Sequence, residues 1–408
     1  MRRIALSALL ASTSLGTAAW ADTADGDALI GQDWDTIVEM ARGGTVTWFM
    51  WGGADNINAY VNDHIGGVLR QQYGITLRQV PIANTVEAVN IVLGEVEAGN
   101  MTNGSVDLIW INGENFRTMK QANLAWCGYN DTLPNNVYVD WDNPAVANDF
   151  GLPVDGCQSP WSRAQFAFAH DSARTPNPPR SIPELIDWVQ ENPGQFTYPA
   201  PPDFNGSVLI RHIFYHVAGG ADNLLGDFDQ AVFDDVAART WALLNDLKPY
   251  MWRQGRTFPA SVTQLDDLFA NQEVALTFNY NASQFGVAVE AGLFPDTVRS
   301  FGLTDGTIGN TNYTLIPVNA PNKAAALVVQ NLLLSPEAQL EKARPEVWGA
   351  PPGIEIDRTS PEMQAAFAAL PQHPSVVPAD ELARNALPEL QAEWLVAIER
   401  GWTENVRQ

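Results

Sequence analysis

Aromatic, amide and carboxylate residues follow predicted strands in the first half of this sequence, where they could hold a small molecule. Trp51 precedes two glycines and ends an apolar, β-rich run at residues 45–51. An indole there could stack on a desolvated organic cation and stabilise the complex by about 0.5–2 kcal/mol; a core tryptophan is the alternative. The polar candidates of this half are Asp55, Asn56, Asn112, Glu114 and Asn115. Asp55, Asn56 or Glu114 could instead cap a helix, and Glu114 is the carboxylate best placed for a cationic group.

A second set of candidates lies later in the chain. Asn205 and Ser207 open a predicted helix, where free backbone N–H groups suit a phosphate or carboxylate unless the two residues only cap the helix. Tyr280 and Asn281 end a predicted strand at residues 274–280. Weaker candidates near other strands are Trp161, Asn310 and Tyr313.

Metal sites and catalytic motifs find little support in the sequence. His212 and His216 have the i, i+4 spacing of helical metal ligands, but the His-Glu-x-x-His pattern and a third ligand are missing. The acidic pairs at 234–235 and 266–267 fall on predicted helices, whereas a glycosidase needs two opposed carboxylates. No Gly-x-Ser-x-Gly elbow, phosphate loop or dinucleotide fingerprint occurs. We therefore predict no metal, no cofactor and no catalysis, with an exported carbohydrate-active hydrolase as the alternative.

The composition excludes several classes of protein. The chain has 408 residues, with 23 Lys and Arg against 47 Asp and Glu, and a formal net charge of −24. This acidity argues against a nucleic-acid partner, because nucleic-acid binding depends on basic side chains that neutralise phosphates. The hydrophobic content of 46% argues against disorder. Since single cores rarely exceed about 250–300 residues, the length predicts two lobes.

The first 21 residues have the features of a secretory signal peptide. Arg2 and Arg3 precede an apolar stretch of mostly small residues at 4–18, and residues 19–21 (AWA) form a small-x-small cleavage pattern. The apolar stretch is shorter than the roughly 20 residues that span a membrane. We predict cleavage after Ala21 and a periplasmic location.

Cys127 and Cys157 are the only cysteines of the chain. In an oxidising compartment they predict one disulfide that closes a loop rich in Asn, Pro and Asp. Closing a loop of this length stabilises a protein by about 3 kcal/mol. Two buried free thiols are the alternative.

The order of predicted strands and helices is that of an α/β protein. Apolar runs at 45–51, 75–80 and 106–110 alternate with amphipathic helical patterns at 57–68 and 85–98. This alternation predicts a parallel sheet with helices on its faces and a ligand at the carboxyl ends of its strands. A second α/β unit has predicted elements at 165–170, 182–190, 208–217, 231–247, 264–271 and 274–280, followed by a mostly helical stretch at 361–406.

Four segments carry recognisable motifs. Residues 321–339 read PNKAAALVVQNLLLSPEAQ, and residues 46–53 read VTWFMWGG. Residues 107–116 read DLIWINGENF, and residues 278–281 read FNYN. Together they resemble the helix, first strand with its glycine loop, and strand-end motifs of the type 2 periplasmic solute-binding proteins of ABC importers. The similarity covers nearly the whole chain after the signal and is nearest to extracellular solute-binding family 1, in a subgroup named for thiamine transport.

This resemblance implies an α/β fold with two lobes, each a mixed sheet flanked by helices, joined by two hinge crossings. The crossings are expected near residues 168–172 and 298–303. The implied boundaries are residues 44–168 and 303–350 for lobe 1, and residues 172–298 and 351–408 for lobe 2.

The resemblance also implies a function. We expect an exported monomer that closes its lobes around a small, cationic organic solute, thiamine-like or polyamine-like, and delivers it to the inner-membrane permease of an ABC importer. Carboxylates on one lobe and a helix N-terminus on the other would suit a cation with a polar or anionic tail, as in thiamine and its phosphate esters. A chemoreceptor-linked sugar binder of the same fold is the alternative.

Overall fold

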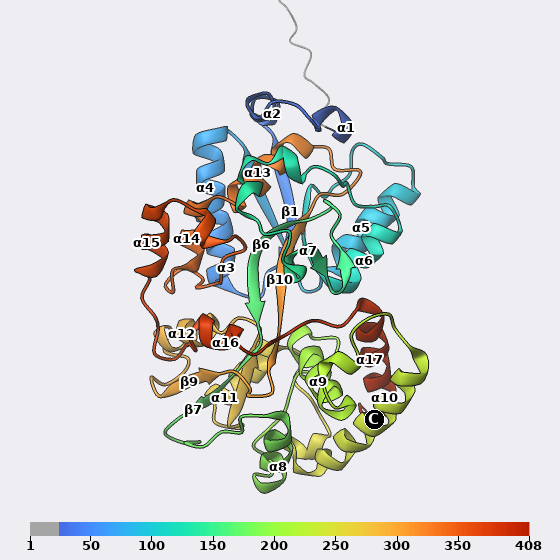
Figure 1. The fold of residues 1–408 in the computed structure, drawn as a ribbon, viewed down its shortest axis with the longest axis vertical. Helices are drawn as coiled ribbons and strands as arrows, with labels where there is room; N and C mark the ends of the chain where they lie inside the picture. Colours follow the sequence, from blue (N-terminus) through green and yellow to red (C-terminus); the bar gives the residue numbers. More distant parts are fainter. Residues whose placement is uncertain (1–23, 408) are drawn as a thin grey trace, which may run out of the picture.

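The computed structural model describes residues 24–407, so the predicted signal peptide lies outside the described residues. The chain forms two lobes, one above the other in Figure 1, and each has its own sheet and hydrophobic core. None of the described helices is long and apolar enough to cross a membrane. The predicted two-lobed α/β class is confirmed.

The sheet of lobe 1 is built from the apolar runs of the N-terminal half. β1 (Thr45–Trp51) pairs in parallel with β2 (Thr76–Ile82) on one side and with β3 (Leu108–Ile111) on the other. β10 (Thr307–Leu315) adds antiparallel to β3, and β6 (Ser159–Gln165) adds antiparallel to β10. The interior of β1 is buried throughout, as expected of a central strand covered on both faces.

Helices pack around this sheet (Figure 1). They are α1 (Gly26–Leu29), α2 (Trp34–Ala41), α3 (Asp55–Ala59), α4 (Gly66–Val68), α5 (Val86–Glu97), α6 (Gly113–Gln121), α7 (Pro144–Ala147), α13 (Lys323–Leu333), α14 (Pro336–Ala343) and α15 (Pro361–Ala368). π-helical turns at Tyr60–Ile65 and Leu69–Tyr73 adjoin α4. The motif at residues 321–339 forms α13 and the first half of α14, and α13 is buried against α2 and β1. This motif therefore has a packing role.

Lobe 2 is built on a three-stranded antiparallel sheet. β7 (Ala167–Asp171) lies between β8 (Leu276–Asn279) and β9 (Val298–Phe301). Its helices are α8 (Ile182–Glu191), α9 (Phe204–Ala218), α10 (Gln230–Leu247), α11 (Val262–Ala270), α12 (Ser283–Glu290), α16 (Ala379–Ala383) and α17 (Ala392–Asn405). α17 packs against α9 and α10, and it places Trp394 and Trp402 in the core of the lobe.

Three stretches of the described chain pass between the lobes. The first is the step from β6 to β7 at Phe166, and the second joins β9 to β10 across residues 302–306. Each lies a few residues from its expected position. The third, residues 369–391, runs from α15 to α17 and is called the C-terminal crossing below. It carries β11 (Ala386–Leu387), which pairs with the first residues of β10.

The C-terminal crossing corrects one expected boundary. α15 packs against α14, and the 3₁₀ turn Ile356–Arg358 packs against the turn Pro134–Tyr138. Residues 356–368 therefore belong with lobe 1, whereas the boundary implied by the family resemblance puts all of residues 351–408 in lobe 2. An amphipathic pattern predicts that a helix forms, but it does not identify the surface that the helix covers.

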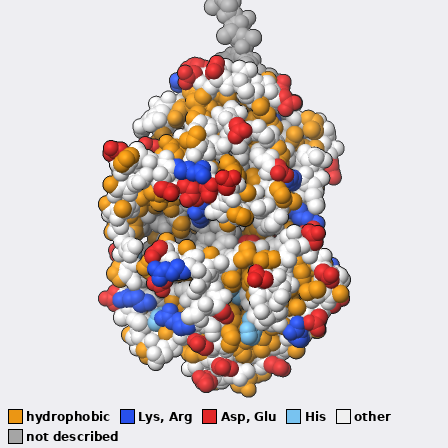
Figure 2. Space-filling model, in the orientation of Figure 1, with side chains coloured by type: hydrophobic (Ala, Val, Ile, Leu, Met, Phe, Trp, Pro, Cys, Tyr) orange, Lys and Arg blue, Asp and Glu red, His pale blue; other side chains and the backbone are white. Residues whose placement is uncertain are grey.

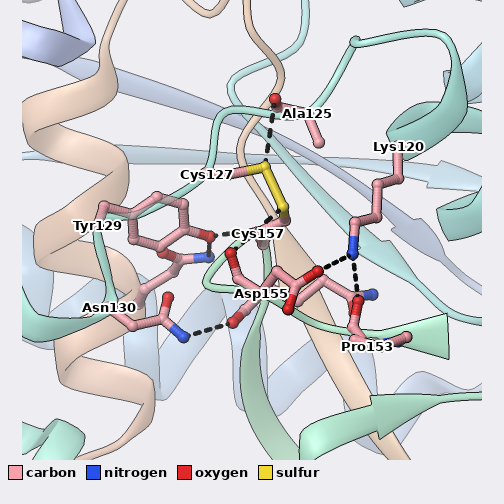
Figure 3. The surroundings of a disulfide bond; sticks show 10 residues. Lys120, Ala125, Cys127, Tyr129, Asn130, Pro153, Asp155 and Cys157 are labelled. Atoms are coloured by element: carbon pink, nitrogen blue, oxygen red, sulfur yellow. Dashed lines mark hydrogen bonds and ion pairs between the residues drawn. A yellow bond between two sulfur atoms is a disulfide. The ribbon is translucent and has the colours of Figure 1, made fainter.

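A disulfide joins Cys127 to Cys157, as predicted (Figure 3). Tyr129 and Asn130 donate hydrogen bonds to the carbonyl oxygens of Cys157 and of the residue after it, at 3.3 and 3.0 Å. The loop that the disulfide closes contains α7 and the short strands β4 (Asn148–Asp149) and β5 (Leu152–Pro153). The bond thus constrains a segment that reaches the space between the lobes.

Replacing Cys127 and Cys157 together by alanine is expected to lower the free energy of unfolding by about 3 kcal/mol. The disulfide restricts the unfolded chain by closing a loop with a sequence separation of 30 residues. Urea denaturation measures the loss. Wild-type protein kept in reductant is the matched control and should lose the same amount, whereas unchanged midpoints in both samples would contradict the prediction.

Candidate functional site

A large cavity between the lobes is the candidate site. Its volume is about 1880 Å³, and Figure 2 shows the hollow between the upper and lower parts of the molecule. Its wall includes most of residues 143–151 of lobe 1, residues 163–165 of β6, most of residues 309–313 of β10, one face of α12 and much of the C-terminal crossing. Because both lobes and all three crossings lie close to it, this cavity can change its size when the lobes move.

A buried ion pair adjoins the cavity wall on the side of lobe 2. Arg211 of α9 is fully buried, and its Nε lies 3.1 Å from Oε2 of Glu389, whose side chain is 5% exposed. Arg211 also donates hydrogen bonds of 3.0 Å to Ser207 Oγ and to the hydroxyl oxygen of Tyr280. Burial is the largest single influence on the pKa of Arg211 and lowers it, but Glu389, Tyr280 and Glu399 together outweigh burial and raise that pKa. Arg211 is therefore charged and holds Glu389, a residue of the C-terminal crossing, against lobe 2.

Glu389 is the wall residue on which several polar groups converge. Its Oε1 accepts a hydrogen bond from the Tyr280 hydroxyl and another, of 3.2 Å, from Asn310 Nδ2. Glu389 Oε2 is occupied by the ion pair with Arg211 Nε. Two other buried atoms of the wall, Asn310 Oδ1 and Asn281 Nδ2, have no hydrogen-bond partner among the described residues. Because buried polar atoms are normally paired, this acceptor and this donor are available to a bound molecule.

Aromatic rings from both lobes surround the Arg211 guanidinium. Its central carbon lies 5.7 Å from the ring centroid of Phe150 in lobe 1 and 5.9 Å from that of Phe204 in lobe 2. The Phe150 and Phe204 centroids are 6.2 Å apart, and Phe204 lies 4.9 Å from Tyr280. Phe150 and Tyr280 also line the cavity. Aromatic faces beside a carboxylate form a combination that binds organic cations.

Asp149 is a second carboxylate of the wall, but both of its oxygens are bonded within lobe 1. They accept hydrogen bonds of 2.8 Å from the backbone N–H of Gly113 and from Nε2 of Gln158. Burial raises the pKa of Asp149 to about 7, and the neighbouring carboxylates Glu114 and Glu389 act in the same direction. Asp149 therefore fastens the disulfide loop to the start of α6.

Two predicted ligand residues, Tyr280 and Asn281, line the cavity, together with the weaker candidates Asn310 and Tyr313. They come from the end of β8 and from the middle of β10. The structure thus brings strand positions that are distant in sequence to one wall.

Asn205 and Ser207 lie behind that wall, at the start of α9. Asn205 Oδ1 accepts a 2.9 Å hydrogen bond from the backbone N–H of Tyr280, and Ser207 Oγ accepts one from Arg211. Asp203 accepts hydrogen bonds from the backbone N–H groups of Asn205 and of the next residue, at 3.0 and 2.9 Å. These amides are bonded within the protein, as the capping alternative describes, and the two side chains support Tyr280 and Arg211.

The predicted residues after β1 lie apart from this group. Trp51 packs against the core of lobe 1 with its ring over Gly53. Asp55 is exposed at the start of α3, and Asn56 donates a 3.3 Å hydrogen bond to the carbonyl oxygen of Val347. None of the three predicted residues is part of the described cavity wall.

Trp161 is fully buried and does not line the cavity. It belongs to a cluster with Trp48, Trp110 and Trp348, at ring-centroid distances of 5.1, 4.9 and 5.0 Å. Its surroundings are those of a core residue.

The predicted residues after β3 are bonded locally. Asn112 Nδ2 donates a 2.6 Å hydrogen bond to the carbonyl oxygen of Thr311, and Asn115 Nδ2 donates one of 2.8 Å to Glu114 Oε1. Burial raises the pKa of Glu114 to about 7, and the carboxylate of Glu399 in lobe 2 adds to this effect. Glu114 therefore meets lobe 2 outside the cavity wall.

His212 and His216, which have the spacing of helical metal ligands, both lie on α9. His212 Nδ1 lies 2.8 Å from the Val208 carbonyl oxygen, and its Nε2 accepts the backbone N–H of Ile308 at 3.0 Å. Burial lowers the pKa of His212 to about 3, so the ring is neutral. Among residues 24–407, no group of three or more His, Cys, Asp and Glu side chains is arranged to hold a metal ion.

Glu389, Phe150 and Arg211 are functional residues of the site that the sequence patterns do not predict. The first two lie in irregular segments with no predicted strand before them, so the rule that ligands sit at strand ends does not reach them. Arg211 had a usable signal, because it is a charged residue within the apolar helical run at residues 208–217. A charge on such a helix must be paired when the helix is buried.

Comparison with known proteins agrees with this architecture. The family described as "Bacterial extracellular solute-binding protein" matches residues 69–386. Protein YnjB of Escherichia coli (strain K12) is 38% identical over 371 residues, which are 91% of this chain and 93% of YnjB.

Two solved structures share the two-lobed fold. The spermidine/putrescine ABC transporter substrate-binding protein PotD from Streptococcus pneumoniae is 14% identical with a TM-score of 0.61, covering 90% of this chain and 100% of PotD. A periplasmic thiamin binding protein is 16% identical with a TM-score of 0.58, covering 89% of this chain and 96% of its own.

Replacing Arg211 by methionine is expected to lower the free energy of unfolding by about 3–5 kcal/mol, because the buried Glu389 loses its counterion. Urea denaturation measures the effect. The matched control is Arg239→Met, which removes an exposed ion pair with Asp235 on α10 and should cost less than about 1 kcal/mol. Equal losses in the two variants would contradict a structural role for the buried pair.

Proposed function

Because this chain belongs to the family of bacterial extracellular solute-binding proteins, we propose that it binds a small, cationic organic solute between its lobes and delivers it to an ABC importer. The binding site is the cavity wall formed by Glu389, Tyr280, Asn281, Asn310 and Phe150. The solute leaves this site chemically unchanged, since the proposed role is capture and release. The hydrolase alternative gains no support from the family match.

The position of Glu389 is the observation that carries this proposal. Its carboxylate lies at the wall of a cavity large enough for an organic solute, where Oε2 is paired with Arg211 and Oε1 accepts from Tyr280 and Asn310. Tyr280, Asn310 and Arg211 fix the side chain in place, so binding costs little further ordering of this residue. A charge-assisted hydrogen bond from a ligand nitrogen contributes about 1.5–3 kcal/mol.

The aromatic rings and amides define the rest of the solute. Phe150 and Tyr280 offer faces that favour a ring or a delocalised cation. Asn281 Nδ2 is a donor that suits a polar or anionic tail. Thiamine has a cationic ring and a polar tail, and the similar solved structures include a thiamin binding protein and the substrate-binding protein of a spermidine/putrescine transporter. These similarities support a nitrogen-containing cation.

Delivery depends on movement of the lobes. Phe166 alone connects β6 to β7, and residues 302–306 connect β9 to β10. Both connections can act as hinges, and the cavity wall contains residues from both lobes. Closure around the solute would give the permease a surface that differs from the empty form. We propose a periplasmic monomer that presents this closed form to the inner-membrane permease.

Titration calorimetry tests the ligand class with thiamine, thiamine monophosphate, spermidine and putrescine, and with glucose and glutamate as non-cationic comparisons. At least one cation should bind with a Kd in the micromolar range or below, which corresponds to about 8 kcal/mol. Glu389→Gln should weaken that binding about 10- to 100-fold, because the charge-assisted bond is lost. Binding of glucose alone would overturn the proposal.

Glu290→Gln is the matched control for Glu389→Gln. Glu290 also lines the cavity, but its side chain is 76% exposed and pairs with His373. The same chemical change there should alter the Kd less than about threefold. Thermal denaturation of both variants without ligand separates lost binding from lost stability.

Export is tested by N-terminal sequencing of the protein recovered from a periplasmic extract. Cleavage after Ala21 gives Asp22 as the first residue. A variant with Ala19 and Ala21 replaced by leucine should remain uncleaved, because signal peptidase requires small residues at both positions. Recovery of an intact Met1 end from the wild-type extract would contradict the predicted signal.

A further inference from the structure

Helices α6 and α17 join the two lobes at a place outside the cavity wall. α6 belongs to lobe 1 and α17 to lobe 2, and the two helices pack against each other (Figure 1). Arg117 of α6 forms an ion pair with Glu393 of α17, and the side chains are 29% and 36% exposed. Because the partners belong to different lobes, this ion pair must break when the lobes move apart.

A pair of carboxylates lies deeper in the same contact. Glu114 stands one helical turn before Arg117, and Glu399 stands almost two turns after Glu393. The carboxylate of Glu399 acts on Glu114 by Coulomb repulsion. Other charged groups that act on one or both carboxylates come from lobe 2 and from the disulfide loop: Arg211, Asp203, Glu389 and Asp149. Arg211 is the cation of this set, and it is already paired with Glu389.

We propose that α6 and α17 form a proton-controlled latch between the lobes. In this latch the Arg117–Glu393 ion pair holds the partly exposed edge of the α6–α17 contact together. Glu114 and Glu399 come together only when they carry a proton. The latch acts on the ligand-free protein, so it does not depend on the identity of the solute.

The direction of the pH dependence follows from the burial of the carboxylates. Burial raises the pKa of Glu114 to about 7, and burial also raises the pKa of Glu399. Separation of the lobes returns Glu114 to water and its pKa towards the ordinary value of 4.5. The closed arrangement therefore holds more protons than the open one. Closure is favoured at acidic pH and weakens as the pH rises from about 4.5 to about 7.

A chain of bonds links the latch to the cavity. The Ser207 hydroxyl is hydrogen-bonded to Glu399, and the same oxygen accepts a 3.0 Å hydrogen bond from Arg211. Arg211 in turn holds Glu389 at the cavity wall. A change at the helix contact can therefore reach the carboxylate that faces the solute without any change in the hinges.

Small-angle X-ray scattering of the ligand-free, exported protein tests the latch. The radius of gyration should be larger at pH 8 than at pH 5, since the ratio of open to closed molecules is expected to rise about tenfold or more. The double variant Glu114→Gln/Glu399→Gln is uncharged at both positions and should show the same small radius at both pH values. Equal wild-type radii at the two pH values, or a pH shift retained in full in the double variant, would overturn the proposal.

Exchanging the charges of Arg117 and Glu393 tests the ion pair of the latch independently. Arg117→Glu and Glu393→Arg should each enlarge the radius at pH 5, and the double variant should restore the wild-type value. Arg239→Glu on α10 is the control for a charge change within one lobe and should leave the radius unchanged. Circular dichroism confirms that each variant is folded. If the double variant does not restore the radius, the Arg117–Glu393 ion pair does not hold the helix contact closed. A failure of solute binding would not affect the result of either experiment.

Discussion

The buried ion pair between Arg211 and Glu389 is the interaction on which the cavity depends. A guanidinium without water must keep its counterion, because an unpaired buried charge costs several kcal/mol. Glu389 belongs to the C-terminal crossing and Arg211 to α9, so this requirement holds the crossing against lobe 2. Tyr280 and Asn310 bond to the same carboxylate and thereby take fixed positions in the wall. Electrostatics thus set the geometry of this side of the site.

The opposite side is held by different means. Phe150 lies in an irregular loop that has little regular structure of its own. The disulfide between Cys127 and Cys157 closes this loop, and Asp149 bonds it to the start of α6. In lobe 1 a disulfide and a buried carboxyl group therefore hold the cavity wall, whereas in lobe 2 an ion pair holds it. Each lobe contributes one rigid wall to the cavity, so changes in the shape of the cavity come from movement at the connections between the lobes.

Sequence patterns predicted the framework better than the site. Alternating apolar runs predicted β1, β2 and β3, and the helical periods predicted α8, α10 and α11, because these patterns reflect burial within one lobe. Tyr280 and Asn281 reached the cavity wall because they end a strand. Trp51 has a similar position in sequence, yet lobe 1 covers it. Glu389 depends on a distant partner, Arg211, and local patterns carry no information about that pairing.

The order of the chain has a consequence for when the protein can fold. Lobe 1 needs β10 and α13, which follow the whole of the lobe 2 sheet in sequence, and lobe 2 needs Trp394 and Trp402 from the last helix. A chain that emerges with its N-terminus first cannot complete the core of lobe 1 before Ile354 is available, and it cannot complete the core of lobe 2 before its last helix is available. Glu389 also arrives only at this late stage. The cavity wall, which needs residues from both lobes and the buried pair of Arg211 and Glu389, therefore forms only after almost the whole chain has been made.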